Sequence, residues 1–151
     1  MNQSHDIAAL TTATCARFGN RPDELLEILH SLQEELGHVP DASLPVIAKA
    51  LNRSRAEIHG VVTFYHDYRR EQPGRHIIKI CRGEACQSVG AEKLCADASA
   101  KFKTRLGATS ADGKVTLEAV YCLGNCALGP AAMVDGKLLG RVDLAKLEPA
   151  E

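Results

Sequence analysis

Four of the six cysteines fall into two close pairs, and these are the side chains in the sequence best suited to chemistry. Four residues separate Cys81 from Cys86, three separate Cys122 from Cys126, and 35 residues lie between the pairs. In a reducing compartment, paired cysteines more often bind a metal or take part in redox reactions than form structural disulfides. The four could hold one Zn²⁺ ion or an iron–sulfur cluster, or could form disulfides with each other.

The residues between the paired cysteines bear on the choice between zinc and iron–sulfur. Each pair encloses a glycine, Gly83 or Gly124, which permits a tight turn and brings backbone amides close to sulfur. Amide hydrogen bonds to sulfur stabilise the additional negative charge of a reduced cluster. The small apolar residues 127–132 are suited to shielding a cluster from water. Zinc sites accept gaps of two to four residues between paired ligands, so spacing alone leaves both metals open.

The other candidate residues favour structural roles. Cys15 and Cys95 lie on or beside apolar helical stripes, so we interpret them as core residues. The six histidines show no spacing typical of a metal site. No Gly-x-Gly-x-x-Gly sequence occurs, so we expect that this chain does not itself bind a dinucleotide.

Residues 1–72 have the pattern of four short helices. The second is expected to begin at Pro22 and to end at Gly37, and the fourth to begin with a capping box at Ser54 and Glu57. The break at residues 72–74, Gln-Pro-Gly, predicts a boundary between a helical segment, 1–72, and a second domain, 73–151. The apolar stripes of the last three helices are Leu25/Ile28/Leu29/Leu32/Leu36, Leu44/Ile47/Ala48/Leu51 and Ile58/Val61/Val62/Tyr65.

The periodicity changes after this break, and an α+β fold is expected. The pattern predicts a strand over 76–80, a helix over 88–106, a half-buried strand over 115–121 and a short helix from Asp143. Asp135-Gly136 predicts a hairpin that joins 132–134 to 137–139. The first two strands, joined through a helix, should be parallel, so Cys81 and Cys122 would follow strands that end at one edge of the sheet.

Composition excludes several classes of function. The chain of 151 residues has 18 basic and 19 acidic side chains. It therefore lacks the surplus of positive charge that nucleic-acid binding needs. Aromatic residues make up only 4%, too few for a stacking platform. No apolar run is long enough to span a bilayer, so membrane insertion is not expected. The start of the chain has neither a basic segment nor a hydrophobic stretch, which predicts a cytoplasmic protein.

The cysteine motifs resemble those of the thioredoxin-like [2Fe-2S] ferredoxins, and in particular the small iron–sulfur subunit of NADH dehydrogenases. The resemblance covers residues 20–147 and includes Leu26–His30, Gly37–Pro40 and Gly60–Tyr65 in the helical segment. It implies a helical segment followed by a thioredoxin-like mixed sheet. Segment 81–87, Cys-Arg-Gly-Glu-Ala-Cys-Gln, is most similar to the gamma subunit of soluble, NAD-dependent, molybdenum-containing formate dehydrogenases.

The resemblance implies that Cys81, Cys86, Cys122 and Cys126 bind one [2Fe-2S] cluster. It implies an electron-transfer subunit, not catalytic alone, that exchanges single electrons with a flavin in another chain. FMN, NAD and the molybdenum cofactor would then belong to partner subunits: one that binds flavin and NAD, and a larger catalytic one. Residues 1–72 are expected to dock the flavin- and NAD-binding subunit.

Three alternatives stay open at this point. The complex could act on quinone or hydrogen instead of formate. The chain could be a zinc-stabilised interaction domain, since zinc accepts the same ligands. It could also be a dithiol–disulfide enzyme, although it lacks the Cys-x-x-Cys motif typical of those enzymes.

Overall fold

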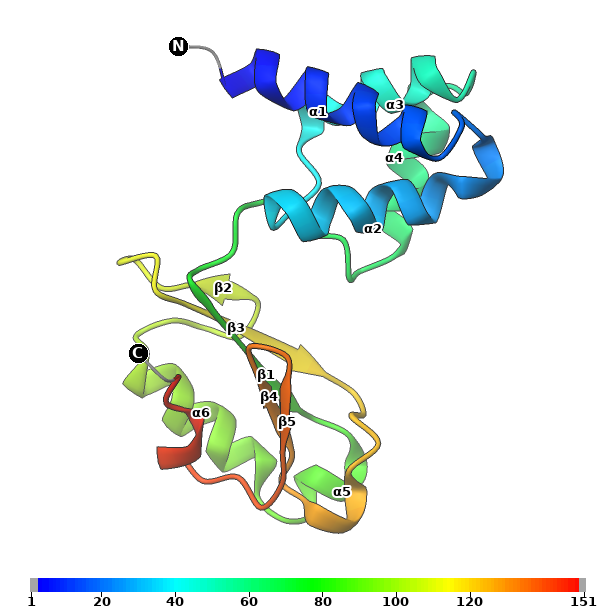
Figure 1. The fold of residues 1–151 in the computed structure, drawn as a ribbon. Helices are drawn as coiled ribbons and strands as arrows, with labels where there is room; N and C mark the ends of the chain where they lie inside the picture. Colours follow the sequence, from blue (N-terminus) through cyan, green and yellow to red (C-terminus); the bar gives the residue numbers. More distant parts are fainter. Residues whose placement is uncertain (1–2, 150–151) are drawn as a thin grey trace. The chain divides into compact units, whose positions relative to one another are not determined.

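The computed structural model describes residues 3–149 (Figure 1). The chain divides into two compact units, Met1–Gln72 and Pro73–Glu151. The division falls at the Gln-Pro-Gly break, and each unit has hydrophobic clusters of its own. In the described part of the chain, no helix is both long and apolar enough to cross a membrane.

The first unit contains the four expected helices. They are α1 (Gln3–Arg17), α2 (Leu25–Leu36), α3 (Leu44–Ala50) and α4 (Arg55–Phe64), with 3₁₀ turns at Pro22–Glu24 and Asp41–Ser43. The predicted start at Pro22 is therefore a 3₁₀ turn that leads into α2.

Two helix ends in this unit follow directly from local sequence. Gly37 has a φ of 78°, in the left-handed region, and its amide donates to the carbonyl of Gln33 at 2.8 Å, which ends α2. The capping box at the start of α4 is confirmed. The Glu57 amide donates to Ser54 Oγ at 3.2 Å, and the Ser54 amide donates to Glu57 Oε2 at 2.8 Å.

The core of the first unit is built from the predicted stripes of α2, α3 and α4. Ile28, Leu32, Ile47 and Ile58 are fully buried within it. Cys15 of α1 is also fully buried there, and this burial raises the pKa of its thiol. The core role predicted for Cys15 is confirmed.

The second unit is a five-stranded mixed sheet in the order β2-β3-β1-β4-β5 (Figure 1). The strands are β1 (His76–Cys81), β2 (Ala108–Thr109), β3 (Val115–Val120), β4 (Ala132–Val134) and β5 (Lys137–Leu139). As expected, β1 and β3 are parallel, with His76 opposite Val115 and Cys81 opposite Val120. The hairpin at Asp135-Gly136 is also confirmed, with φ values of 49° and 83° that suit its tight turn.

Two expectations for the second unit need correction, and one of its strands was not predicted. The helix expected over 88–106 is shorter, α6 (Ala91–Lys101), because Gly90 at its start has a φ of 99°, and a separate short helix, α5 (Glu84–Gln87), precedes it. The helix from Asp143 is only a 3₁₀ turn, Ala145–Leu147, because Glu148 precedes Pro149 and takes an extended conformation. Strand β2 was not predicted, since two residues carry no periodicity.

Candidate iron–sulfur site

Both cysteine pairs lie at one edge of the sheet, where β1 and β3 end. Cys81 is the last residue of β1, and Cys122 follows β3 by two residues. Because the two strands are parallel and in register to their ends, both loops leave the sheet at the same edge, as the sequence predicted. Figure 1 shows α5, which carries Cys86, beside the loop after β3, where Cys126 opens a 3₁₀ turn.

The second pair has the geometry of two ligands on one tetrahedral metal ion. Cys122 Sγ and Cys126 Sγ are 3.8 Å apart. A tetrahedral ion with metal–sulfur bonds of about 2.3 Å separates two of its sulfur ligands by about 3.8 Å. The side chains of this pair therefore have the spacing that a shared metal requires.

The first pair is buried and interacts with the second. Cys81 and Cys86 are each 2% exposed, whereas Cys122 and Cys126 are exposed. Burial is the largest cause of the raised pKa of Cys86, and the neighbouring thiols of Cys81 and Cys126 raise it further. A hydrogen bond to Cys122, the charge of Cys122 and the charge of Cys81 raise the pKa of Cys126. Thiolates this close together repel one another, and bound ferric ions would offset that repulsion.

The four cysteines form two adjacent pairs, which bears on the kind of metal group they could hold. A [2Fe-2S] cluster takes four cysteines, two on each iron, so it matches two adjacent sulfur pairs. The donor set and its arrangement therefore fit this cluster.

Two backbone amides contact the sulfur atoms, one of them from a loop glycine as expected and one from outside the loops. The Gly124 amide donates to Cys122 Sγ at 3.3 Å, and the Ala131 amide hydrogen-bonds the Cys86 sulfur and lowers its pKa, against the larger effect of burial. Gly83 has a different role. A Cβ at this position would lie 3.0 Å from the carbonyl oxygen of Tyr121, so glycine lets the two cysteine loops approach each other.

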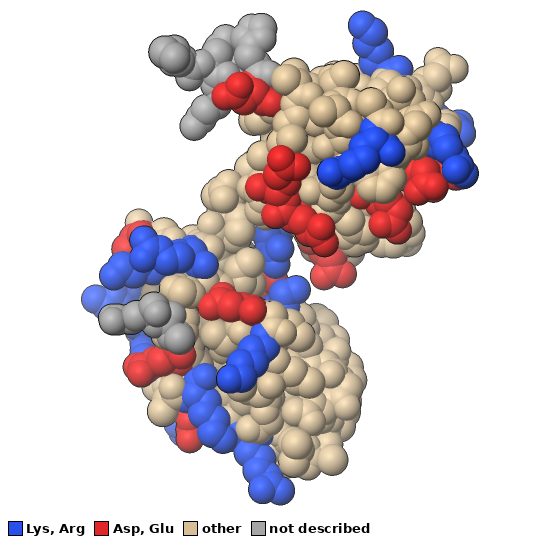
Figure 2. All heavy atoms as spheres, in the orientation of Figure 1, with Lys and Arg blue, Asp and Glu red and all other residues tan. Residues whose placement is uncertain are grey.

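The site is apolar and closed on one side, and open on the other. Ala91 and Ala131 are buried against Cys81 and Cys86. Within the predicted shielding segment 127–132, only Ala131 and Ala132 are buried. The open side has exposed apolar side chains, namely Val89, Tyr121 and Leu128. In Figure 2, the part of the second unit where α5 lies shows few charged atoms.

Cys95 lies in a different apolar cluster from the four paired cysteines. It is 5% exposed on α6 and packs with Ile78 and Leu94 in the core of the second unit. Burial is the largest influence on its thiol and raises its pKa. The structure thus places Cys95 in the core, as the sequence predicted.

One charged residue beside the site makes a contact that the sequence does not indicate. Arg82 directly follows Cys81, and its guanidinium lies 2.6 Å from the Glu92 carboxylate at the start of α6. The hydrogen bond to Glu92 and the charge of that carboxylate raise the pKa of Arg82. The two residues are ten positions apart on different elements, so no local pattern of residue types predicts the pair.

We expect Arg82→Gln to lower the reduction potential of a cluster at this site and Glu92→Gln to raise it. A positive charge beside the site stabilises the more negative reduced state, and Glu92 partly neutralises that charge. The shifts should be on the order of tens of millivolts and should shrink at high salt, because the pair is solvent-accessible. Redox titration followed by electron paramagnetic resonance measures both potentials. Equal potentials in the two variants would contradict the expectation.

Comparison with known proteins identifies the family. Residues 11–150 match the family described as thioredoxin-like [2Fe-2S] ferredoxin. The chain belongs to this family. Membership confirms the family and the α+β fold expected from the sequence, and it assigns one [2Fe-2S] cluster to this thioredoxin-like ferredoxin.

Individual relatives come from several complexes. The ferredoxin is 38% identical over 117 residues to a subunit of the NADH-quinone oxidoreductase of Pseudomonas aeruginosa, with 78% of this chain and 70% of the relative covered. It is 31% identical over 118 residues to the HndA subunit of the NADP-reducing hydrogenase of Solidesulfovibrio fructosivorans, with 78% and 69% covered. Among solved structures, an air-oxidized NAD⁺-reducing [NiFe]-hydrogenase matches with a TM-score of 0.70 and 26% identity. That match covers 82% of this chain and 21% of the hydrogenase chain.

Proposed function

We propose that this ferredoxin is the electron-transfer subunit of a soluble, NAD-linked oxidoreductase, and that Cys81, Cys86, Cys122 and Cys126 hold its [2Fe-2S] cluster. The observation that carries the proposal is the pairing of sulfur atoms at the shared end of β1 and β3, with 3.8 Å between Cys122 Sγ and Cys126 Sγ. When bound, the cluster supplies one-electron chemistry.

The residues around the cysteines have distinct tasks in this function. The buried pair, with Ala91 and Ala131, excludes water from one side of the site. The N–H groups of Gly124 and Ala131 direct partial positive charge toward the sulfur atoms and stabilise negative charge there. The exposed pair and the apolar rim leave the other side accessible, where a redox partner can approach closely.

We propose formate as the substrate of the complex. Support comes from segment 81–87, which resembles the gamma subunit of NAD-dependent formate dehydrogenases. The partners would be a flavin- and NAD-binding subunit that exchanges single electrons with this chain, and a larger molybdenum-containing subunit, all in the cytoplasm. The second candidates are quinone and hydrogen, because the relatives described above belong to NADH-quinone oxidoreductase and hydrogenase complexes.

The purified protein should be red-brown and should contain two irons and two acid-labile sulfides per chain. Colorimetric iron and sulfide assays, with zinc measured by mass spectrometry on the same sample, test this. One zinc and no iron would overturn the iron–sulfur site in favour of the zinc-stabilised domain.

The complex that co-purifies with a tagged chain distinguishes the substrates. Molybdenum in that complex and NAD⁺ reduction driven by formate would support the formate assignment. Nickel in the complex, or quinone reduction driven by NADH, would replace formate with hydrogen or quinone as the substrate.

The isolated chain should bind NADH only weakly in calorimetry, since it has no dinucleotide fingerprint.

A further inference from the structure

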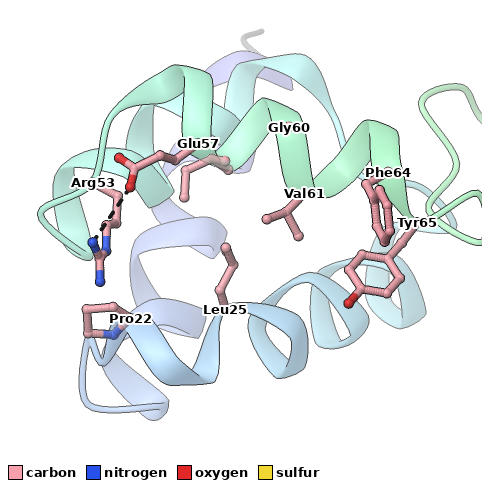
Figure 3. Close-up of a pocket in the computed structure, with 9 residues that line it drawn as sticks. Pro22, Leu25, Arg53, Glu57, Gly60, Val61, Phe64 and Tyr65 are labelled. Carbon is pink, nitrogen blue, oxygen red and sulfur yellow. Dashed lines mark ion pairs between the residues drawn. The ribbon is translucent and has the colours of Figure 1, made fainter.

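The turn that carries Cys126 is not held in place by side-chain packing. The helices of the first unit are held in that way: Leu25 of α2 and Val61 of α4 point toward one another and pack against the core (Figure 3). The 3₁₀ turn Cys126–Leu128 differs, because none of its three residues is buried. Contacts other than an apolar core must therefore fix the position of Cys126.

The backbone of residues 140–142, the strap, supplies these contacts. The Arg141 amide donates a hydrogen bond to the carbonyl oxygen of Leu128 at 2.6 Å. The Val142 amide donates to the carbonyl oxygen of Pro130 at 2.9 Å. The chain that follows Cys126 is thus joined to the strap by two main-chain hydrogen bonds, which involve no side chain.

The strap itself is fixed to the body of the second unit. It follows β5, which pairs with β4. Val142 is 5% exposed and belongs to the same apolar core as Leu147, which is fully buried. The Lys146 ammonium donates to the carbonyl oxygen of Arg141 at 2.8 Å. The strap is therefore a fixed support against which the exposed turn rests.

Gly140 allows the strap to lie this close to the turn. A Cβ at this position would lie 2.7 Å from Leu128 Cβ, 2.9 Å from Asn125 Nδ2 and 3.1 Å from the carbonyl oxygen of Leu128. Carbon atoms that are not bonded to each other pack best at about 3.5–4.0 Å, so a side chain would push the turn away. The φ of Gly140 is not in the left-handed region, so close approach is the reason for glycine here.

We propose that Gly140 is a positioning residue for the cluster ligand Cys126. By admitting the strap to the turn, Gly140 keeps Cys126 Sγ beside Cys122 Sγ, at the observed 3.8 Å. Residues that hold a metal ligand in place raise the affinity of the site, because the ligand does not have to be ordered when the metal binds. This inference rests on the proposed function, since it takes Cys126 as a ligand.

The test replaces Gly140 by alanine in the full-length chain. In Gly140→Ala the added methyl group displaces Leu128 and lengthens the hydrogen bond from Arg141. Iron should then pass to an added chelator about tenfold faster than in the wild type. The electron paramagnetic resonance signal of the dithionite-reduced protein should shift or broaden. In the iron-free chain, hydrogen–deuterium exchange should become faster in the peptide that contains the strap.

Gly74→Ala is the matched control. A Cβ at Gly74 would lie 2.9 Å from the backbone nitrogen of Val115, the first residue of β3, so this glycine is also required by close approach. Gly74 lies before β1, at the opposite end of the sheet from the cysteines. This variant should have a lower melting temperature. Well below that temperature, its iron release and its resonance signal should match those of the wild type.

Lys146→Met is a second variant, which adds no bulk inside the protein. It removes the hydrogen bond to the Arg141 carbonyl oxygen and leaves Gly140 unchanged. Because Lys146 is exposed, the variant should fold normally. It should speed iron release in the same direction as Gly140→Ala, by a smaller factor. Lys137→Met, on the exposed part of β5, removes the same charge and should release iron like the wild type.

Three results would overturn the role of Gly140. The first is iron release at the wild-type rate in both Gly140→Ala and Lys146→Met. The second is unchanged hydrogen exchange in the strap of Gly140→Ala, since the strap would then not depend on the glycine. The third is equally fast iron release from Gly74→Ala, which would make the effect a general loss of stability. A wild-type chain without iron would instead overturn the proposed function, and the role of Gly140 toward the cluster with it.

Discussion

Replacing Cys122 by serine should abolish cluster binding, with iron content falling from two per chain to near zero and the visible absorption lost. Cys122 Sγ lies 3.8 Å from Cys126 Sγ and accepts a hydrogen bond from the Gly124 amide. A serine hydroxyl is a far weaker ligand because it stays protonated near neutral pH, whereas a thiol is deprotonated on binding a metal. Because Cys122 is exposed, the melting temperature of the iron-free chain should change little. Iron assay, absorption spectroscopy and thermal denaturation measure the three effects.

Cys15→Ser and Cys95→Ser are the controls for this loss. Both residues are buried in hydrophobic cores that do not include the paired cysteines. Each variant should keep two irons, while burial of a hydroxyl in an apolar environment lowers the free energy of unfolding by about 1–3 kcal/mol. If Cys15→Ser loses iron as completely as Cys122→Ser does, the ligand assignment is wrong.

A shortened protein that begins at Gln72 should keep its iron and colour but should no longer bind the flavin-binding subunit. The second unit holds all four paired cysteines and has its own apolar core around Ile78, Ile80 and Leu117. The helices of the first unit form a separate core of their own, so their removal should leave the sheet folded. Size-exclusion chromatography of a mixture of both chains, with iron assay of each fraction, measures binding and cluster retention together.

Two results would contradict this division of tasks. Loss of iron on shortening would mean that the helical segment is needed to fold the second unit. Normal assembly with the flavin-binding subunit would mean that docking uses the second unit, for example the apolar rim around Tyr121. The full-length chain, treated in the same way, is the reference for both.

Features that depend on a few neighbouring residues were predictable from the sequence. Gly37 ends α2, Ser54 and Glu57 cap α4, and Asp135-Gly136 closes the hairpin, because each signal acts over at most three residues. The meeting of the cysteine pairs was predictable for a different reason. Parallel strands joined through a helix must end at the same edge of a sheet, whatever the details of the loops.

Features that depend on distant residues or on one backbone angle were not predictable. The helix expected over 88–106 begins only at Ala91 because Gly90 has a positive φ, which a pattern of apolar residues does not reveal. The contact between Arg82 and Glu92 exists only once the loop after β1 meets the start of α6.

The in-register pairing of β1 with β3 has a consequence for how such sites vary between proteins. Cys81 lies opposite Val120. The two cysteine loops, which follow β1 and β3, therefore stay close together as long as this pairing is kept. The length of the chain between the two strands does not affect the distance between the loops. Residues inserted near 103–106, before β2, should leave the sulfur atoms in place, whereas one residue inserted within β3 would reverse which side chains face the core. A search for related sites should therefore hold the gaps of four and three residues fixed and leave the interval between the pairs free to vary.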